Sequence, residues 1–208
     1  MMTIQPVTKT IQRLLLAAAL LPGLAFASAQ QELSQRLGKV DAFSADFTQK
    51  VTSPDGEVLV EGQGKVSVQR PNLFRWHADL PDENLLVSDG RTLWYYTPMV
   101  EQVTAMKLED ATEQTPFVLL IRNQNRDWAK YHVVQTADTF TLTPKDSAAV
   151  TGKFVVTVGQ DGQVRGFSVE EQDGQRSQFR FAKFARGTQD RKQYSFTPPP
   201  GVELDDKR

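Results

Sequence analysis

Residues 58–70 read VLVEGQGKVSVQR, and this stretch decides the fold class. As far as Val68, one side of it carries only apolar residues and glycine: Val58, Val60, Gly62, Gly64, Val66 and Val68. A period of two is the pattern of a β-strand with one buried face. Glycines inside a strand often mark strong bending or a bulge. The stretch therefore predicts a strand that bends within a half-buried sheet.

The same alternation continues on both sides of this stretch. It recurs in residues 43–48, 74–78, 85–87, 93–96, 100–104, 131–135, 139–143, 153–158, 164–171 and 176–184. Turn signals separate several of these runs, above all residues 53–56 (SPDG), Asp89-Gly90 and Asp173-Gly174. About ten or eleven short strands with turns between them predict a mainly β protein built as an antiparallel sheet, sandwich or barrel.

Two segments break the β pattern. Leu33, Leu37 and Val40 lie at i, i+4 and i+7, which is the apolar stripe of a helix. Thr115 as N-cap and Pro116 at the first helical position predict a second helix. Its residues 117–121 (FVLLI) are all apolar, so most of its surface needs cover. We expect both helices to lie against one strongly curved sheet.

The first residues have the order of a secretory signal peptide. Lys9 and Arg13 precede an apolar run at residues 14–21, and residues 25–27 (AFA) supply a cleavage site. Cleavage after Ala27 is predicted, and a second possible cut lies after Ala29. Without a cysteine there is neither a disulfide nor a lipid-modified N-terminus. We expect residues 28–208 to form a single domain free in the periplasm, with residues 198–208 as an extended C-terminal arm.

Charge and motifs exclude several classes of function. Loss of Lys9 and Arg13 with the signal turns 24 basic and 25 acidic residues into 22 and 25, which argues against a nucleic-acid partner. No later apolar run approaches the roughly 20 residues of a membrane span. The chain has two histidines and none of the common hydrolase, zinc or phosphate-loop motifs, so we predict no enzyme, cofactor or metal. A glycosidase-type carboxylate pair stays open from the residues alone.

Arg70 is the most unusual position of the opening stretch. Counting by twos from Val58, an unbroken register points Arg70 toward the interior. A charge there is costly unless several acceptors surround it. Arginine has five donors and can bind a set of backbone carbonyls, such as the unpaired ones at the end of a helix. In the alternative, the strand ends at Val68 and Arg70 turns to solvent before Pro71.

Aromatic residues recur on the alternating strands and allow two interpretations. They are Phe43, Phe47, Phe74, Trp76, Trp94, Tyr96, Phe140, Phe154, Phe179 and Phe181. Aromatics dominate most cores, so one interpretation is plain packing. The other is an apolar cavity in a curved sheet, because barrel-like sheets commonly hold one ligand site.

Six motifs that follow one another along the mature chain make a specific pattern. They are F-x-A-x-F-x-Q (43–49), R-P-x-x-F-R-W (70–76), S-D-G-x-x-L-W-Y-Y (88–96), E-Q-V (101–103), T-P-x-x-L-L (115–120) and F-T-P-P-x-G-V (196–202). In this order and spacing they resemble the periplasmic outer-membrane lipoprotein carrier family, LolA. The resemblance implies an incomplete antiparallel β-barrel of about 11 strands, with a hydrophobic concave face covered by a lid of helices.

The resemblance also implies a function and partners. Such a protein is a monomer without a cofactor or stable membrane insertion. It accepts acylated lipoproteins from an inner-membrane ATP-driven release complex, an ABC transporter, and delivers them to an outer-membrane lipoprotein receptor. The apolar cavity that shields the acyl chains is predicted to be lined by Phe47, Phe74, Trp76, Trp94 and Leu120.

The resemblance further assigns a role to Arg70. In this family the corresponding arginine hydrogen-bonds backbone groups of the lid and holds the empty cavity closed. By position, those groups belong to Leu37, Leu120 and Ile121. Two alternatives remain: a periplasmic lipid- or lipoprotein-sensing regulator built on the same half-barrel, and a periplasmic hydrolase.

Overall fold

The computed structural model describes residues 28–114, 116–146 and 152–208, so the predicted signal peptide and the predicted N-cap at Thr115 lie outside it. Twelve strands form one sheet: β1 (Ala42–Thr52), β2 (Val58–Gln69), β3 (Leu73–Leu80), β4 (Asn84–Asp89), β5 (Thr92–Thr97), β6 (Gln102–Lys107), β7 (Tyr131–Thr136), β8 (Thr139–Pro144), β9 (Lys153–Val158), β10 (Val164–Glu170), β11 (Arg176–Arg186) and β12 (Glu203–Lys207). The helices are α1 (Ala29–Leu37), α2 (Leu108–Gln114), α3 (Pro116–Arg122) and α4 (Asn125–Trp128), with 3-10 turns η1 (Pro98–Val100) and η2 (Arg191–Tyr194).

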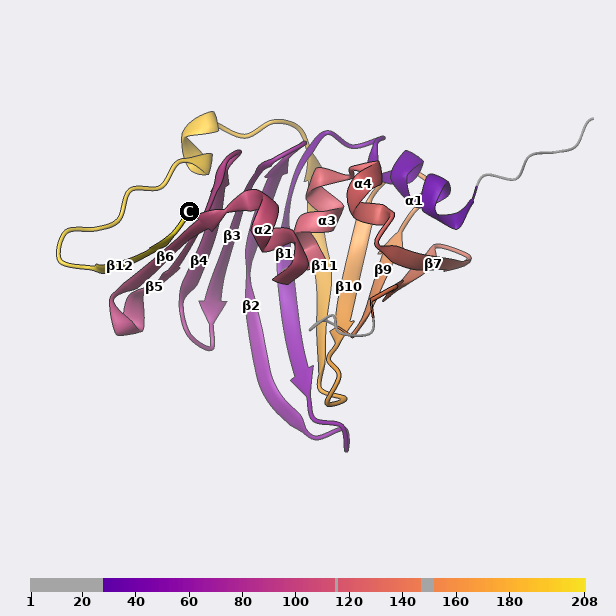
Figure 1. Cartoon of the computed structure of the whole chain (residues 1–208), viewed down its shortest axis with the longest axis horizontal. Coiled ribbons are helices and arrows are strands. Elements are labelled where there is room, and N and C mark those ends of the chain that lie inside the picture. Colours follow the sequence, from indigo (N-terminus) through magenta and orange to yellow (C-terminus); the bar gives the residue numbers. More distant parts are fainter. Residues whose placement is uncertain (1–27, 115, 147–151) are drawn as a thin grey trace, which may run out of the picture.

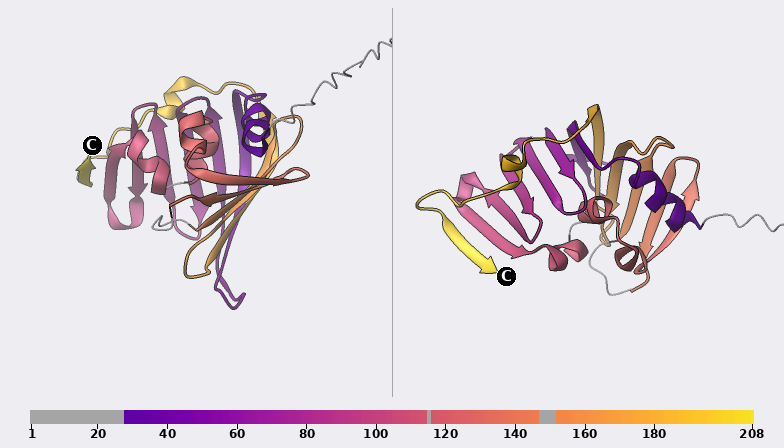
Figure 2. Two further views of the ribbon diagram at one scale, coloured as in Figure 1. Left: turned by 45° about the vertical axis from the view of Figure 1, so that its right-hand side comes forward. Right: turned by 90° about the horizontal axis from the view of Figure 1, so that it is seen from above.

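The sheet is open and strongly curved. Its order is β12-β6-β5-β4-β3-β2-β1-β11-β10-β9-β8-β7, and every pair is antiparallel except β12 with β6. The four α-helices lie on its concave side (Figure 1), and the view from above shows the sheet bent around them (Figure 2). The predicted incomplete antiparallel barrel with a helical lid is therefore confirmed.

Three details differ from the prediction. The twelfth strand, β12, lies inside the predicted extended arm and adds to the edge of β6 in parallel. Four α-helices replace two: α2 buries only Leu108 and Ala111 among its described side chains, too few positions for the sequence to show a stripe. Val100, predicted to begin a strand, lies in η1, and the strand begins at Gln102.

Gly64 explains how the sheet bends at the opening stretch. It pairs with Phe47 of β1 and Ala78 of β3. A Cβ atom added at Gly64 would lie 2.0 Å from the carbonyl oxygen of His77 and 2.7 Å from the ring of Phe47. The missing side chain therefore lets the neighbouring strand and an aromatic ring approach β2 closely.

The two faces of the sheet carry separate apolar clusters. The concave face and the helices share the main core, which includes Phe47, Phe74 and Trp76. On the convex face, strands β3 and β4 contact η2, and the residues buried there are Leu85, Val87, Val103, Ala105 and Tyr194. The C-terminal segment thus covers the outside of the sheet on its β3–β6 side.

The placement of Trp94 in the cavity lining is wrong. Leu93 belongs to the main core, so its neighbour Trp94 faces the opposite side of the sheet. There the Trp94 ring lies 5.8 Å from the ring of Phe196, and the guanidinium of Arg208 lies 5.1 Å from its centre. Alternation shows that Leu93 and Trp94 face opposite sides, but it does not tell which side is concave.

Candidate functional site: an apolar concavity closed by a lid

The concave face presents a continuous layer of aromatic rings. The rings of Phe47 and Trp76 stack with centres 4.0 Å apart, and those of Phe167 and Phe179 stack at 4.5 Å. The ring of Trp76 lies edge-on to Phe179 at 5.3 Å. Strands β1, β3, β10 and β11 therefore supply one aromatic floor. Such a surface offers dispersion contacts and excludes water from whatever covers it.

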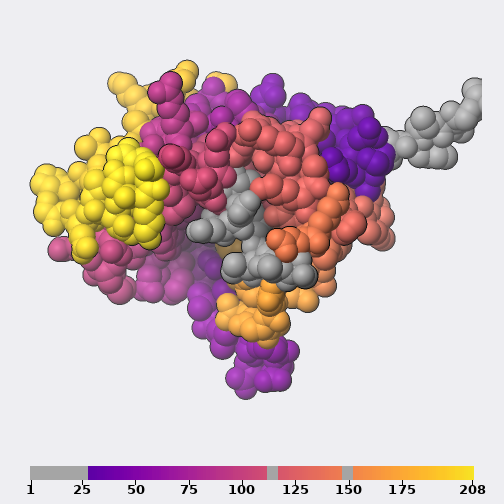
Figure 3. Space-filling view, viewed as in Figure 1, coloured from indigo at the N-terminus to yellow at the C-terminus, as the bar shows by residue number. Residues whose placement is uncertain are grey.

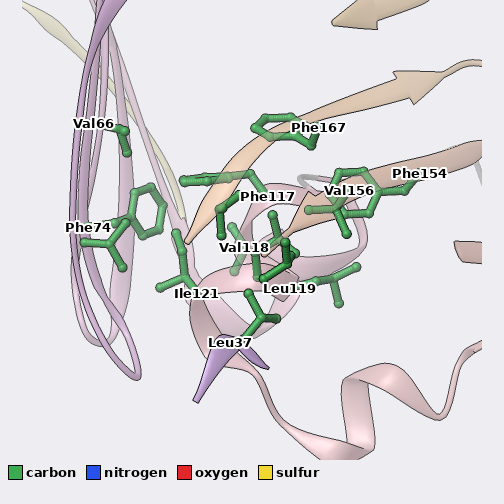
Figure 4. Close-up of a cluster of buried hydrophobic side chains, with 14 of the residues drawn as sticks. Leu37, Val66, Phe74, Phe117, Val118, Leu119, Ile121, Phe154, Val156 and Phe167 are labelled. Atoms are coloured by element: carbon green, nitrogen blue, oxygen red, sulfur yellow. The ribbon is translucent and has the colours of Figure 1, made fainter. Parts of the chain in front are cut away.

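In the described structure, the lid (helices α1, α2, α3 and α4) occupies this concavity. Helix α3 inserts five consecutive buried side chains, Phe117 to Ile121. Phe117 reaches deepest, with its ring 5.0 Å from Trp76 and 5.4 Å from Phe167. Figure 4 shows Val118, Leu119 and Ile121 directed into the same cluster. In the space-filling view the salmon surface of α3 and α4 lies between the surfaces of α2 and α1 (Figure 3).

The structure brings together four of the five predicted cavity residues. Phe47, Phe74, Trp76 and Leu120 share the main core, with exposed fractions of 8% or less. They come from β1, β3 and α3, so moving the lid would separate Leu120 from the other three. Trp94 is outside the group. Phe117 and Phe167 belong to the site although the sequence prediction did not include them. Phe117 lies directly after the predicted start of an apolar helix, so the sequence could have indicated that it belongs to the site.

Arg70, directly after β2, joins the sheet to the lid. Its Nη1 donates to the carbonyl oxygens of Leu120 and Ile121, the latter at 2.8 Å. Its Nε donates to the carbonyl oxygen of Val40 at 2.9 Å. The first two acceptors belong to the last turn of α3, where carbonyls lack helical partners. One half-buried side chain thus donates hydrogen bonds to backbone carbonyls of two separate segments.

Burial lowers the pKa of Arg70 to about 10, and the nearby Asp41 carboxylate opposes this shift. The guanidinium therefore remains a cation at neutral pH. Hydrogen bonds from a charged donor contribute about 1.5–3 kcal/mol each. A cation held by carbonyl dipoles alone is costly to keep in an apolar surrounding, so the closed arrangement depends on all of its acceptors.

The structure corrects one predicted acceptor. The carbonyl bonded by Arg70 near the end of α1 is that of Val40, not Leu37. Helix α1 ends at Leu37, and the Leu37 carbonyl accepts the backbone N–H of Val40 in the following turn. The Leu37 side chain is fully buried in the main core. Leu37 therefore packs the lid, while the chain after the helix supplies the acceptor.

Asn123 is a second junction of the lid, which sequence reasoning missed. It follows α3 with a left-handed backbone (φ 48°), a position that asparagine tolerates. Its Nδ2 donates to the carbonyl of Ser34 in α1 at 2.9 Å, and its Oδ1 accepts from the Trp128 indole of α4 at 3.0 Å. Three helices are therefore tied together at one side chain.

An Asn123→Asp variant tests this junction. The carboxylate keeps the acceptor for Trp128 but places an oxygen against the Ser34 carbonyl oxygen. We expect the free energy of unfolding to fall by about 1–3 kcal/mol, measured by urea titration. Asn125→Asp, two residues on at an exposed site, is the matched control and should change it by less than about 0.5 kcal/mol. Equal effects of the two variants would contradict the assigned role.

Clusters of His, Asp and Glu side chains are where a metal ion could bind. Within residues 28–114, 116–146 and 152–208, no group of three or more His, Asp or Glu lies close enough to bind an ion. His77 lies on the outer face between Asp79 and Glu83, at 3.4 and 3.0 Å. No helix in the same part of the chain is long and apolar enough to cross a bilayer.

Comparisons with known proteins agree on one family. A model described as "Outer membrane lipoprotein carrier protein LolA" matches residues 38–197. The outer-membrane lipoprotein carrier protein of Photobacterium profundum is 64% identical over 196 residues, which cover 94% of this chain and 98% of that one. The protein of the same name from Klebsiella pneumoniae (strain 342) is 47% identical over 202 residues, covering 95% and 100%.

A solved structure shows the same fold at low identity. It is an uncharacterized conserved protein from Thermus thermophilus, with a TM-score of 0.53 and 13% identity. The alignment covers 87% of this chain and 100% of that chain. At such identity the likeness supports the architecture alone.

Proposed function

Because this chain belongs to the outer membrane lipoprotein carrier family LolA, we propose that it carries acylated lipoproteins through the periplasm and is not an enzyme. The observation that supports this most is the aromatic concave face closed by a lid, with Arg70 joining helix α3 of that lid to the sheet. The site is apolar and is covered by separate short helices, and a hydrocarbon ligand could bind there if these helices moved aside.

The energetics of acyl chains explain the need for such a site. Each buried CH₂ is worth about 0.8 kcal/mol, so one long acyl chain exposed to water costs on the order of 10 kcal/mol. When the lid moves, the apolar face of α3 leaves the aromatic floor. The floor can then contact the acyl chains in place of water. The acyl chains then take the place that Phe117, Leu120 and their neighbours occupy in the closed form.

Handover follows from differences in affinity. Lipid moves to the next protein when that protein binds it more tightly, and a carrier that binds too well retains its cargo. Closure by Arg70 lowers the apparent affinity, because only the open fraction binds. We propose that the carrier loads as a monomer at an inner-membrane ATP-driven transporter and unloads at an outer-membrane receptor. Residues 28–208 act as one domain in this cycle.

A release assay tests the function. Protein beginning at residue 28 is added to spheroplasts that export acylated lipoproteins, with spheroplasts alone as control. We expect lipoprotein in the supernatant as a one-to-one complex, which then empties into isolated outer membranes. Lipoprotein that stays on the spheroplasts, despite a folded carrier and an active transporter, would contradict the proposal and favour a lipid-sensing regulator.

A further inference from the structure

The convex face of strands β8 to β11 carries a groove on the side of the sheet opposite the lid. Its lining includes Thr157 of β9, Ser168 of β10 and Arg180 of β11. Cross-strand pairs place these residues on one face: Thr157 pairs with Gly166, which in turn pairs with Arg180. The residues that alternate with them, Val156 and Phe167, belong to the main core on the other face. The groove is therefore separate from the acyl-chain site.

Small residues between long ones produce the hollow. Gly166 lies at a register shift in β10, and a Cβ atom added there would lie 2.4 Å from the carbonyl oxygen of Phe179. Ser168, two residues on, keeps only 5% of its surface exposed. Arg165, Arg176 and Arg180 line the same groove. Short side chains thus form the base, and three guanidinium groups stand around it.

The arginines of this groove are not held in ion pairs, although Glu170 of β10 lies directly opposite Arg176 of β11. Within residues 28–114, 116–146 and 152–208, Arg165, Arg176 and Arg180 form no ion pair, and no acidic residue lines this part of the groove. Other cations on the same strands are paired: Lys153 with Glu170 at 3.0 Å, and Lys183 with Asp46 at 2.8 Å. Three unpaired arginines gather here in a chain of net charge −1, so the excess of positive charge is local.

Ser168 lies at the base of the groove, and 5% of its surface is exposed. Its hydroxyl can donate a hydrogen bond to an acceptor group of a ligand placed among the arginines.

The groove is elongated. Gln178 and Arg180 also line a second hollow over β1 and β2, where Lys50 and Glu61 offset each other in charge. Together the two hollows extend over β9, β10, β11, β1 and β2, with Thr139 of β8 and Leu80 of β3 at their ends. With strands about 4.8 Å apart, this path is roughly 19 Å long, enough for about six extended residues. Amide and hydroxyl groups along it can bind a peptide main chain, whereas its recessed base does not fit a flat bilayer surface.

We propose that this convex groove docks an extended, acidic segment of a partner protein, with carboxylates at Arg165, Arg176 and Arg180 and an acceptor at Ser168. Because the groove lies on the face opposite the lid, a docked carrier keeps its cavity free to load and unload. The interaction is therefore independent of cargo and of the lid. This inference does not rest on lipoprotein transfer. Peptide binding and lipoprotein transfer are measured separately, so the failure of one proposal is distinguishable from the failure of the other.

A peptide-binding assay tests the inference. The probe is a fluorescent heptapeptide of alternating Asp and Glu, with the Asn and Gln peptide of equal length as control, both followed by fluorescence anisotropy. We expect the wild-type protein to bind the acidic peptide and not the neutral one. Binding should weaken at least fivefold when ionic strength rises from about 0.02 M to about 0.3 M, because salt screens the charges.

Two double variants locate the site. Arg176→Gln with Arg180→Gln removes two groove cations and should weaken binding about tenfold. Arg191→Gln with Lys192→Gln removes the same charge from exposed positions of η2 and should change binding less than twofold. Both pairs lie at exposed sites, so circular dichroism should be unchanged. An Arg70→Leu protein should bind the peptide as the wild type does.

Three outcomes would overturn the inference. In the first, the acidic peptide does not bind at low salt. In the second, both double variants lose binding equally, which would mean that net charge alone is responsible. In the third, phosphatidylglycerol vesicles, and not the peptide, bind the protein in a way that needs Arg176 and Arg180. That result would replace the protein partner with a membrane surface.

Discussion

Arg70→Leu is expected to take up lipoprotein and to pass it on poorly. Leucine cannot donate to the carbonyls of Val40, Leu120 and Ile121, which in the closed form would be left without this donor. Buried acceptors without partners disfavour the closed form, whereas in the open form water reaches them. A loss of only about 3 kcal/mol changes the ratio of closed to open protein roughly 150-fold. The open fraction rises, and the cargo is held more tightly.

The measurement is the fraction of lipoprotein transferred from the purified complex to outer membranes. We expect at least a tenfold slower transfer for Arg70→Leu, with loading from spheroplasts retained. Arg75→Leu is the matched control, because Arg75 follows on the neighbouring strand β3 and pairs with Val87 on the convex face. It should transfer as the wild type does.

Arg70→Lys separates charge from geometry. An ammonium group is a compact donor and cannot span acceptors on two segments as the planar guanidinium does. We expect an intermediate transfer rate. Normal delivery by both Arg70 variants would show that closure by this side chain does not limit release, and the assigned role would be wrong.

Phe74→Glu is expected to abolish the carrying of lipoprotein. Phe74 is 1% exposed, and its ring meets that of Phe117 at 6.2 Å. A carboxylate at this position has no cationic partner in the main core, so ionisation costs several kcal/mol and draws water under the lid. The apolar floor is then broken at its centre, and the acyl chains lose part of their shield.

The assay is again release from spheroplasts, followed by transfer to outer membranes. We expect at least a tenfold loss of delivered lipoprotein. Met99→Glu adds the same charge at a site that is 70% exposed and should have no effect. Circular dichroism checks that the sheet is retained, and a Phe74→Ala variant, which adds no charge, should fall between the two. Normal delivery by a folded Phe74→Glu protein would contradict an acyl site on the concave face.

The sequence predicts the strands well because their signal is local. The alternation from Val58 onward points Arg70 inward, and the structure places its guanidinium against the lid carbonyls. The register of this strand alone left the inward and outward orientations of Arg70 open, and the resemblance to the carrier family favoured the inward one. The local sequence does not determine which face of a strand points toward the lid. For this reason Trp94 was assigned to the wrong side, although its strand was correctly identified.

Backbone acceptors and the short lid helices were less predictable for a different reason. Any carbonyl near the end of a helix can accept from Arg70, and the side-chain pattern does not distinguish Leu37 from Val40. Asn123 acts through one donor and one acceptor that reach residues of α1 and α4. Such hydrogen bonds depend on the packing of three helices, and the spacing of residues along the chain does not predict them.

The position of β1 in the middle of the sheet determines how this protein can fold. Strands β1 to β6 follow one another as neighbours, and so do β7 to β11, but the two halves meet only where β1 pairs with β11. In that seam Phe43 pairs with Arg186, which lies near the other end of the chain. Pairings of such long sequence separation are slow to form.

A nascent chain therefore waits with the edge of β1 unpaired and the aromatic face uncovered, a state prone to aggregate. The sheet cannot be completed until residues 176–186 have paired with β1. Folding of this carrier is accordingly a late, all-or-none event rather than a gradual growth from the N-terminus.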